Sequence, residues 1–242
     1  MTAAAAACLV LVPGLACDAA VWTEVMAALP ADVQPWVAEG ALQHDIGAMA
    51  ETVLRDAPAE RFALAGHSLG GRIALEVMRR APQRVSQLAL LDTGWQPRSP
   101  GEAGEREQTQ RHALVDIARH EGMRAVGERW APGMLHPDAL GSAVHDAVLA
   151  MVARQPAEHF AAQQTALLAR PDATDVLAAI DCPTLVLCGR QDGWAPLERH
   201  EAMAQRIAGA RLAVVENSGH MSTMEQPAAV AAELRAWLER AA

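Results

Sequence analysis

A serine, an aspartate and a histidine in this chain together carry the groups that acyl transfer requires. Ser68, Asp192 and His220 each follow a short apolar stretch. A serine hydroxyl is a weak nucleophile until a base takes its proton, and histidine suits that task because its pKa lies near neutrality. A carboxylate fixes the imidazole tautomer and stabilises the imidazolium that forms. The residue types predict Ser68 as nucleophile, His220 as general base and Asp192 as the acid that orients it.

The surroundings of Ser68 predict a sharp turn from a strand into a helix. Gly66 and Gly70 lie two positions to either side of the serine, between the apolar run 61–65 and the helical pattern 72–80. Glycine at these positions removes side chains that would clash at so tight a corner. A Gly-Ser turn without chemistry is the alternative, and the strand before and the helix after it favour the catalytic interpretation. The pattern of a phosphate-binding loop, which ends in Gly-Lys-Ser/Thr, is absent.

Composition restricts the classes of partner. The chain has 242 residues, 51% of them hydrophobic, which suits one sizeable domain or one domain with an inserted lid. The net charge of −9 argues against nucleic acid and anionic membranes as partners. All 20 positively charged residues are arginine, so no lysine of this chain can form a Schiff base.

The cysteines and the N-terminus favour the cytoplasm. The four cysteines, Cys8, Cys17, Cys182 and Cys188, show neither zinc-ligand nor C-x-x-C spacing. Buried free thiols are expected for Cys8, Cys182 and Cys188, and a reducing compartment with them. Residues 3–17 are apolar and 15–17 resemble a lipoprotein cleavage site. The first basic residue is Arg55, however, so the positive start of a secretory signal is missing. No stretch reaches the length of a membrane span.

Apolar runs alternate with helical patterns over both ends of the chain. Such alternation predicts a parallel sheet with helices on both faces, and so an α/β fold. Six strands are expected, at 8–12, 33–38, 62–65, 85–91, 183–188 and 211–215. The helices between and after them are expected at 21–29, with Asp18 as N-cap, and at 45–56, 72–80, 197–207 and 226–240.

The middle of the chain contains helical patterns only. They cover 104–120, 123–130, 137–154, 156–169 and 172–179, after a linker rich in proline and glycine. This predicts a core domain of residues 1–94 and 181–242, with a helical cap at 95–180 inserted between two strands. Five histidines fall within the cap: His112, His120, His136, His145 and His159. Their spacing favours helix surface over a metal site.

A second aspartate competes for the role of the acid. The carboxyl ends of parallel strands meet at one edge of a sheet, where ligands bind. Asp92 ends one strand and Asp192 follows another. The interpretation of Asp92 as a structural cap is favoured, and Asp192 is assigned as the acid.

The motif at 66–70 and the chain order Ser68, Asp192, His220 resemble those of the α/β-hydrolase fold family, in particular its serine esterases and lactonases with a helical cap. The resemblance implies an oxyanion hole formed by the backbone N–H groups of Leu15 and Leu69. The family commonly has His-Gly-X in the first of these loops, whereas this chain has proline at position 13. The resemblance also implies that neither a cofactor nor a metal is required. There is no room before the first strand for the leading hairpin of the full family sheet.

These residues predict a serine hydrolase that cleaves carboxylic esters of small apolar substrates through an acyl-enzyme. An apolar pocket wall is expected from Trp95, Trp130, Trp194, Met134, Leu135 and Met221, with ordinary core packing as the alternative for each. A substrate carboxylate could be bound by Arg106, Arg111 and Arg124, as a lactonase or a carbon–carbon bond hydrolase would need. A cofactor-free perhydrolase and a ligand receptor on the same fold remain open. The expected partner is a small-molecule ester or lactone, and the expected assembly is a monomer or a homodimer.

Overall fold

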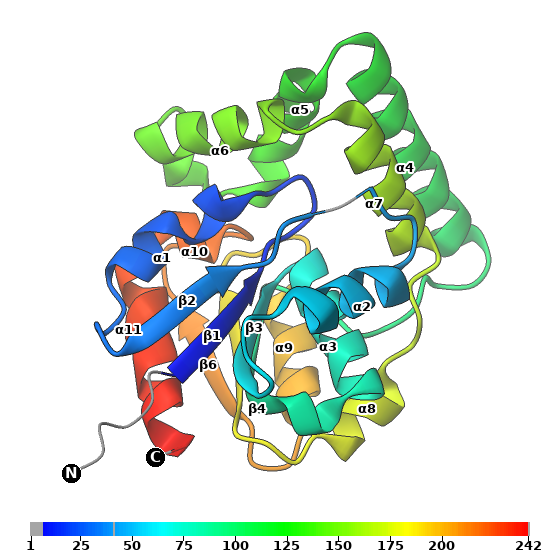
Figure 1. The fold of residues 1–242 in the computed structure, drawn as a ribbon. Coiled ribbons are helices and arrows are strands. Elements are labelled where there is room, and N and C mark those ends of the chain that lie inside the picture. Colours follow the sequence, from blue (N-terminus) through cyan, green and yellow to red (C-terminus); the bar gives the residue numbers. More distant parts are fainter. Residues whose placement is uncertain (1–6, 41, 242) are drawn as a thin grey trace.

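Six parallel strands form the centre of the computed structural model, which describes residues 7–40 and 42–241 (Figure 1). Their order across the sheet is β2-β1-β3-β4-β5-β6. This confirms the predicted α/β fold with six parallel strands. The strands are β1 (Ala7–Val12), β2 (Val33–Val37), β3 (Phe62–His67), β4 (Val85–Leu91), β5 (Thr184–Gly189) and β6 (Arg211–Val215).

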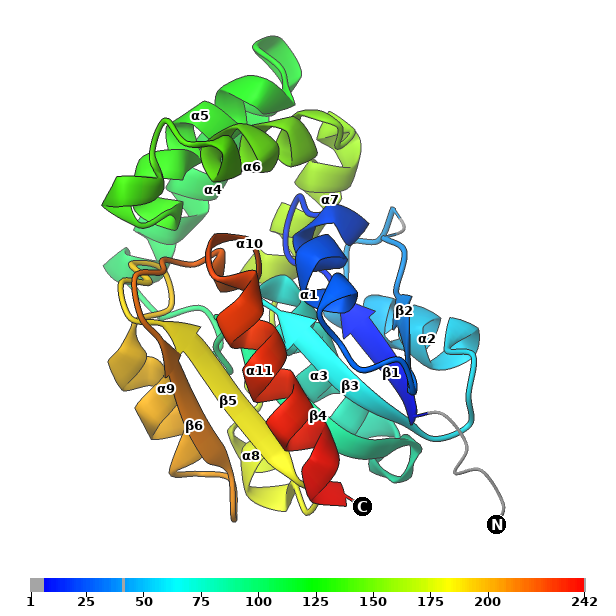
Figure 2. The ribbon, with the colours of Figure 1, turned by 90° about the vertical axis from the view of Figure 1, so that its left-hand side faces the viewer.

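Helices cover both faces of this sheet because its strands are apolar on both sides. In β1, Leu9 and Leu11 pack on one face, while Val10 and Val12 pack on the other. The first face lies against α1 (Thr23–Ala27) and α11 (Pro227–Leu238), as Figure 2 shows. The second face is covered by α2 (Ile46–Asp56), α3 (Leu69–Arg80), α8 (Thr174–Ala179) and α9 (Leu197–Ala204). Burial on both faces is typical of parallel sheets and explains the continuous apolar runs of the sequence.

Four helices between β4 and β5 lie over the carboxyl edge of the sheet (Figures 1 and 2). They are α4 (Glu102–His120), α5 (Met123–Met134), α6 (Ala143–Ala153) and α7 (Ala157–Leu168). The fifth helix of this segment, α8, packs against α3 beside the sheet instead. The division of the chain at residues 95 and 180 therefore remains a prediction.

Two of the helices that differ from the sequence prediction do so for local reasons. The expected helix at 137–154 begins only at Ala143, because Gly141 has a positive φ of 76° and Ser142 then caps the helix through the His145 N–H. The helix expected at 21–29 divides into a 3₁₀ turn (Ala19–Trp22), with Asp18 as N-cap, and α1. The short helix α10 (Ser222–Glu225), directly after His220, was not predicted.

The described cysteines Cys8, Cys17, Cys182 and Cys188 are all free thiols. Within residues 7–40 and 42–241, no helix combines the length and the hydropathy that crossing a bilayer requires.

Candidate active site

The glycines on either side of Ser68 leave room for the sharp turn that presents the serine hydroxyl. Ser68 adopts φ 54° and ψ −114° between the end of β3 and the start of α3. A Cβ atom at Gly66 would overlap the carbonyl of Gly70, and one at Gly70 would overlap the carbonyl of Val12. The positive φ is strained for a serine, and such strain is typical of functional sites.

Ser68, His220 and Asp192 form a continuous hydrogen-bonded chain. The Ser68 Oγ atom lies 2.8 Å from Nε2 of His220, whose Nδ1 atom lies 2.8 Å from Oδ2 of Asp192. The other carboxylate oxygen of Asp192 accepts the backbone N–H groups of Trp194 and Ala195, both at 2.8 Å. An Nδ1–H donated to the carboxylate leaves Nε2 free to accept the serine proton.

The electrostatics of these three hydrogen-bonded residues make the imidazole of His220 more basic. Burial lowers the pKa of His220, but the carboxylate of Asp192 outweighs it, so the pKa of His220 is raised. Burial raises the pKa of Asp192, but His220 and two backbone N–H groups outweigh it, so the pKa of Asp192 lies below its ordinary value. Asp192 is therefore ionised at neutral pH and stabilises a proton on His220.

Asp92 is buried close to these three residues and has a structural role. Its two carboxyl oxygens accept the Gly189 N–H at 2.9 Å and the Ser222 hydroxyl at 2.5 Å. Burial, followed by the nearby charge of Asp192, raises the pKa of Asp92 to about 8. Asp92 is thus largely protonated at neutral pH and ties the end of β5 to the start of α10, which is consistent with the structural role that the sequence favoured for it.

Two further buried histidines hold the backbone around the site. His67 donates from Nε2 to the carbonyl of His220 at 2.8 Å, and burial followed by the His220 charge lowers the pKa of His67 to about 4. His200 accepts the Thr93 N–H at Nε2, 3.0 Å away, and burial lowers its pKa to about 4 as well. The Thr93 hydroxyl donates to the Ser68 carbonyl at 2.6 Å. Both rings are therefore neutral and brace the strained turn and the histidine loop.

Two residues that line the cavity of Ser68, Leu15 and Leu69, have backbone N–H groups without a partner among the described residues. Leu69 is the first residue of α3, so its N–H has no partner within the helix. Leu15, in the loop after β1, lines the same cavity, and in the described chain its N–H donates no hydrogen bond. The two groups are available for a developing oxyanion.

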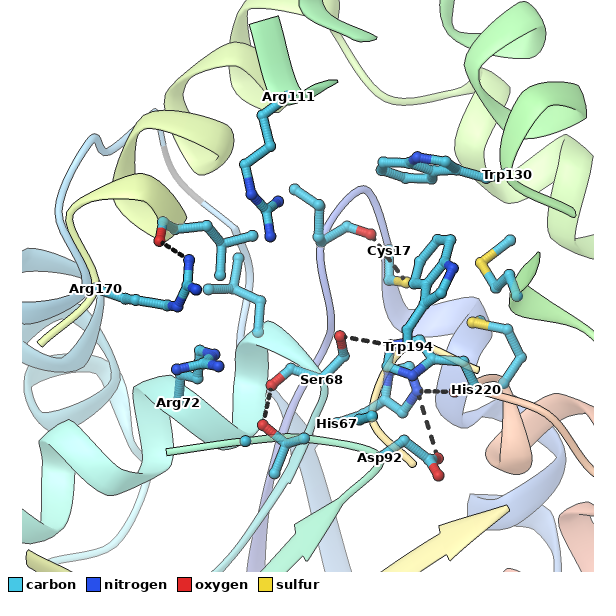
Figure 3. A pocket seen from close by; sticks show the side chains of 18 of the residues that line it. Cys17, His67, Ser68, Arg72, Asp92, Arg111, Trp130, Arg170, Trp194 and His220 are labelled. Atoms are coloured by element: carbon cyan, nitrogen blue, oxygen red, sulfur yellow. Dashed lines mark hydrogen bonds and ion pairs between the residues drawn. The ribbon is translucent and has the colours of Figure 1, made fainter. Parts of the chain in front are cut away.

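A cavity of about 470 Å³ opens above Ser68 and has two unlike halves. Figure 3 shows Trp130, Trp194 and His220 on one side of Ser68. The Trp194 ring centroid lies 5.1 Å from that of His220 and 5.4 Å from that of Trp130. Three methionines also line the cavity: Met134, Met151 and Met221.

Arginines line the other half of the cavity (Figure 3). Arg111 and Arg170 both pair with Glu107, at 2.8 and 2.7 Å. Burial, followed by the neighbouring arginines, lowers the pKa of Arg72 to about 9, and burial lowers the pKa of Arg199. Four arginines thus face the cavity beside one glutamate.

A sequence model of the Alpha/beta hydrolase family matches residues 9–233. The chain belongs to the alpha/beta hydrolase family. This membership agrees with the sheet order and with the strand–serine–helix turn described above, and it confirms the resemblance drawn from the sequence.

Three relatives of this alpha/beta hydrolase illustrate the range of the family. The chain is 31% identical to the 2-succinyl-6-hydroxy-2,4-cyclohexadiene-1-carboxylate synthase of Serratia proteamaculans, over 80% of this chain and 74% of the relative. It is 28% identical to the pimeloyl-[acyl-carrier protein] methyl ester esterase of Vibrio campbellii, over 94% and 92%. A malate-bound thermophilic esterase from Thermogutta terrifontis superimposes with a TM-score of 0.87 at 28% identity, covering 97% of this chain and 90% of the esterase. These relatives support a general hydrolase activity.

Some of the other predicted site residues of this hydrolase line the cavity, and others do not. Trp130, Trp194, Met134 and Met221 line the cavity. Trp95 does not: it is buried in the core on the α3 side of the sheet, with the Arg206 guanidinium 5.2 Å from its ring centroid. Leu135 is likewise buried in the core. For these two residues the alternative holds, which was ordinary core packing, and the expectation of a pocket wall was wrong.

Of the three cap arginines considered from the sequence, only Arg111 lines the cavity. Arg106 and Arg124 pair with Glu102 and Glu128 on the same exposed helix faces. Arg72, Arg170 and Arg199 also line the cavity, and none of them was predicted from the sequence. Arg72 alone carried a signal, since it follows Ser68 by one helical turn.

Two of the cap histidines, His136 and His145, accept local backbone hydrogen bonds. The Nδ1 atoms of His136 and His145 accept the N–H groups of Asp138 and Gly141, respectively. Across residues 7–40 and 42–241, no three His, Cys, Asp or Glu side chains come together as a metal ion would require.

Proposed function

We propose that this protein is a serine hydrolase that cleaves carboxylic esters through an acyl-enzyme. The observation that carries the proposal is the hydrogen-bonded chain from Ser68 through His220 to Asp192, with both links at 2.8 Å. Ser68 is the proposed nucleophile, His220 the general acid–base, and Asp192 the group that orients and stabilises the imidazolium.

In the first step the Ser68 oxygen attacks the ester carbonyl while His220 Nε2 takes the hydroxyl proton. The carbonyl oxygen becomes an oxyanion, to which the N–H groups of Leu15 and Leu69 donate. The bond between the carbonyl carbon and the alcohol oxygen then breaks, and His220 gives its proton to the departing alcohol. An ester of Ser68 remains.

In the second step water replaces the alcohol. His220 takes a proton from the water as its oxygen attacks the Ser68 ester, and a second oxyanion forms in the same place. The bond to the Ser68 oxygen breaks, the serine regains its proton from His220, and the carboxylic acid leaves. This chain's own residues supply every proton transfer in the two steps.

The tryptophan half of the cavity supports the predicted preference for small apolar groups. Trp130 and Trp194 offer flat apolar faces directly beside His220. We propose the segment 95–180 as the cap that closes the cavity, because α4, α5 and α7 supply lining residues. A cytoplasmic monomer or homodimer remains part of the proposal.

A second candidate is a lactonase or carbon–carbon bond hydrolase that acts on an anionic substrate with the same three residues. The arginines of the cavity favour it, because guanidinium groups match carboxylates in shape and charge. The malate bound to the Thermogutta esterase and the carboxylate in the name of the Serratia relative's product point the same way.

The proposal is tested with p-nitrophenyl esters from acetate to long acyl chains, using Ser68→Ala as the control. Saturable hydrolysis that Ser68→Ala abolishes supports the serine esterase, and the profile across chain lengths gives the size of the pocket. Labelling of Ser68 by an organophosphate without ester turnover redirects the search to lactones and anionic diketones. Wild-type turnover by Ser68→Ala contradicts the mechanism.

A further inference from the structure

Arg72 and Arg199 come together over a glycine without a carboxylate between them. A Cβ atom at Gly94 would lie 3.1 Å from Nη2 of Arg72 and 3.5 Å from Nη1 of Arg199. Arg72 extends from the first turn of α3 and Arg199 from α9, so two separate core elements direct like charges to one place. Glycine at position 94 leaves the room that both side chains occupy.

The remaining contacts of this pair are to backbone carbonyls. Arg72 donates to the Gln96 carbonyl at 2.9 Å, and Arg199 donates to the Trp194 carbonyl at 3.2 Å. Neither forms an ion pair with a described residue, whereas the cap arginines Arg111 and Arg170 share the carboxylate of Glu107. Both free guanidinium groups line the cavity of Ser68.

Two adjoining and partly buried cations that form no direct ion pair are costly unless an anion joins them. The lowered pKa of Arg72 reflects that burial and the neighbouring arginines. An organic carboxylate has the size and the planar, bidentate shape to accept from both. The two guanidinium groups are therefore arranged to bind an anion that enters with the substrate.

We propose that Arg72 and Arg199 form a subsite for a carboxylate on the acyl part of the substrate. The preferred substrates are then half-esters of aliphatic dicarboxylic acids with a small apolar alcohol. The acyl assignment rests on the proposed function, because it requires an ester carbonyl at Ser68.

The position of His220 decides which part of the ester meets the arginines. His220 must protonate the departing alcohol, so the alcohol lies on the His220 side, where Trp194 and Trp130 form the wall. The carbonyl oxygen points to the backbone N–H groups, which leaves the acyl chain the direction away from His220. Figure 3 shows that Arg72 lies on that opposite side of Ser68.

Binding tests the subsite independently of turnover. Calorimetry with Ser68→Ala compares monoethyl glutarate with ethyl pentanoate and with inorganic phosphate. We expect monoethyl glutarate to bind most tightly, and Arg72→Gln or Arg199→Gln in the same background to weaken it by about tenfold to a hundredfold. Arg72→Lys, which keeps the charge, should recover part of the loss. Arg106→Gln is the matched control on the exposed face of α4 and should bind as Ser68→Ala does.

Each contrary binding result overturns the subsite. Equal binding of monoethyl glutarate and ethyl pentanoate, or affinity unchanged in both glutamine variants, contradicts a carboxylate at this place. Tighter binding of phosphate that depends on Arg72 contradicts the choice of carboxylate over phosphate.

Turnover tests the orientation. Rates in a pH-stat compare three esters with the charge on the acyl chain, on the alcohol or on neither: monoethyl glutarate, 3-carboxypropyl butanoate and ethyl pentanoate. We expect kcat/KM to be highest for monoethyl glutarate, and its ratio to that of ethyl pentanoate to fall at least tenfold in Arg199→Gln. A preference for 3-carboxypropyl butanoate contradicts the acyl assignment. Wild-type rates in Ser68→Ala would contradict the proposed function instead, and the calorimetry would still decide the subsite.

Discussion

The Nδ1 atom of His220 lies 2.8 Å from Oδ2 of Asp192, and the other oxygen of that carboxylate is held by two backbone N–H groups. Asp92 is also buried close by, but it binds Gly189 and Ser222. The two carboxyls therefore differ in charge as well as in partner, since Asp92 has a pKa of about 8 and that of Asp192 is lowered.

This difference predicts unequal effects of the two amide substitutions. Asp192→Asn should lower kcat by about a thousandfold or more, because the amide favours the wrong imidazole tautomer and does not stabilise the imidazolium. Asp92→Asn should retain activity within about tenfold, since it replaces a largely neutral acid with a neutral amide of the same shape. Steady-state kinetics on one p-nitrophenyl ester measure both. A larger loss in Asp92→Asn would assign the acid to that residue.

The rate should depend on pH through His220. Only the unprotonated imidazole accepts the serine proton, so kcat/KM should rise with pH through the pKa of His220 in the free enzyme. The carboxylate of Asp192 holds the proton on the ring, which places the midpoint above the ordinary histidine value of 6.5. Asp192→Asn should move the midpoint down. A profile that falls as pH rises through this range contradicts the role of His220.

His200 should stabilise the fold at neutral pH and less so in acid. His200→Phe leaves the buried N–H of Thr93 without its acceptor, which should lower the free energy of unfolding by about 1–3 kcal/mol above pH 6.5. The folded-state pKa of about 4 lies below the ordinary 6.5, so protonation favours the unfolded chain. The difference in unfolding free energy between wild type and variant should therefore become smaller as pH falls from 6.5 to 4.

Urea denaturation at several pH values measures that difference, with the exposed His112→Phe as the matched control. A difference that is constant over this range would mean that His200 does not stay neutral in the fold.

Much of the architecture could be predicted because most of the strands are apolar runs, β2 with its exposed Gln34 and Pro35 being the exception. The residues Ser68, Asp192 and His220 follow three such runs directly, so a parallel sheet brings them to one edge regardless of the details of the loops. Local sequence thus specifies the part of the site that sits on strand ends.

The substrate half of the cavity could not be predicted in the same way. Arg170 follows α7 before β5, whereas Arg199 lies in α9 after it, so whether they meet depends on how the segment between β4 and β5 folds back over the sheet. Nothing in the sequence distinguishes His200 from other helical histidines, and only the fold shows that it is buried against Thr93. Trp95 is an aromatic residue of the kind that lines apolar pockets, but it is buried in the core beside α3.

The most direct measurement is acylation of Ser68 itself. Mixing the protein with a p-nitrophenyl ester and quenching in acid should give a burst of p-nitrophenol equivalent to the protein present. The acyl group should appear by mass spectrometry on the peptide that carries Ser68, and Ser68→Ala should show neither, whereas the exposed control Ser99→Ala should show both. Hydrolysis without a burst and without acyl mass on that peptide, at a rate unchanged in Ser68→Ala, would contradict the acyl-enzyme account.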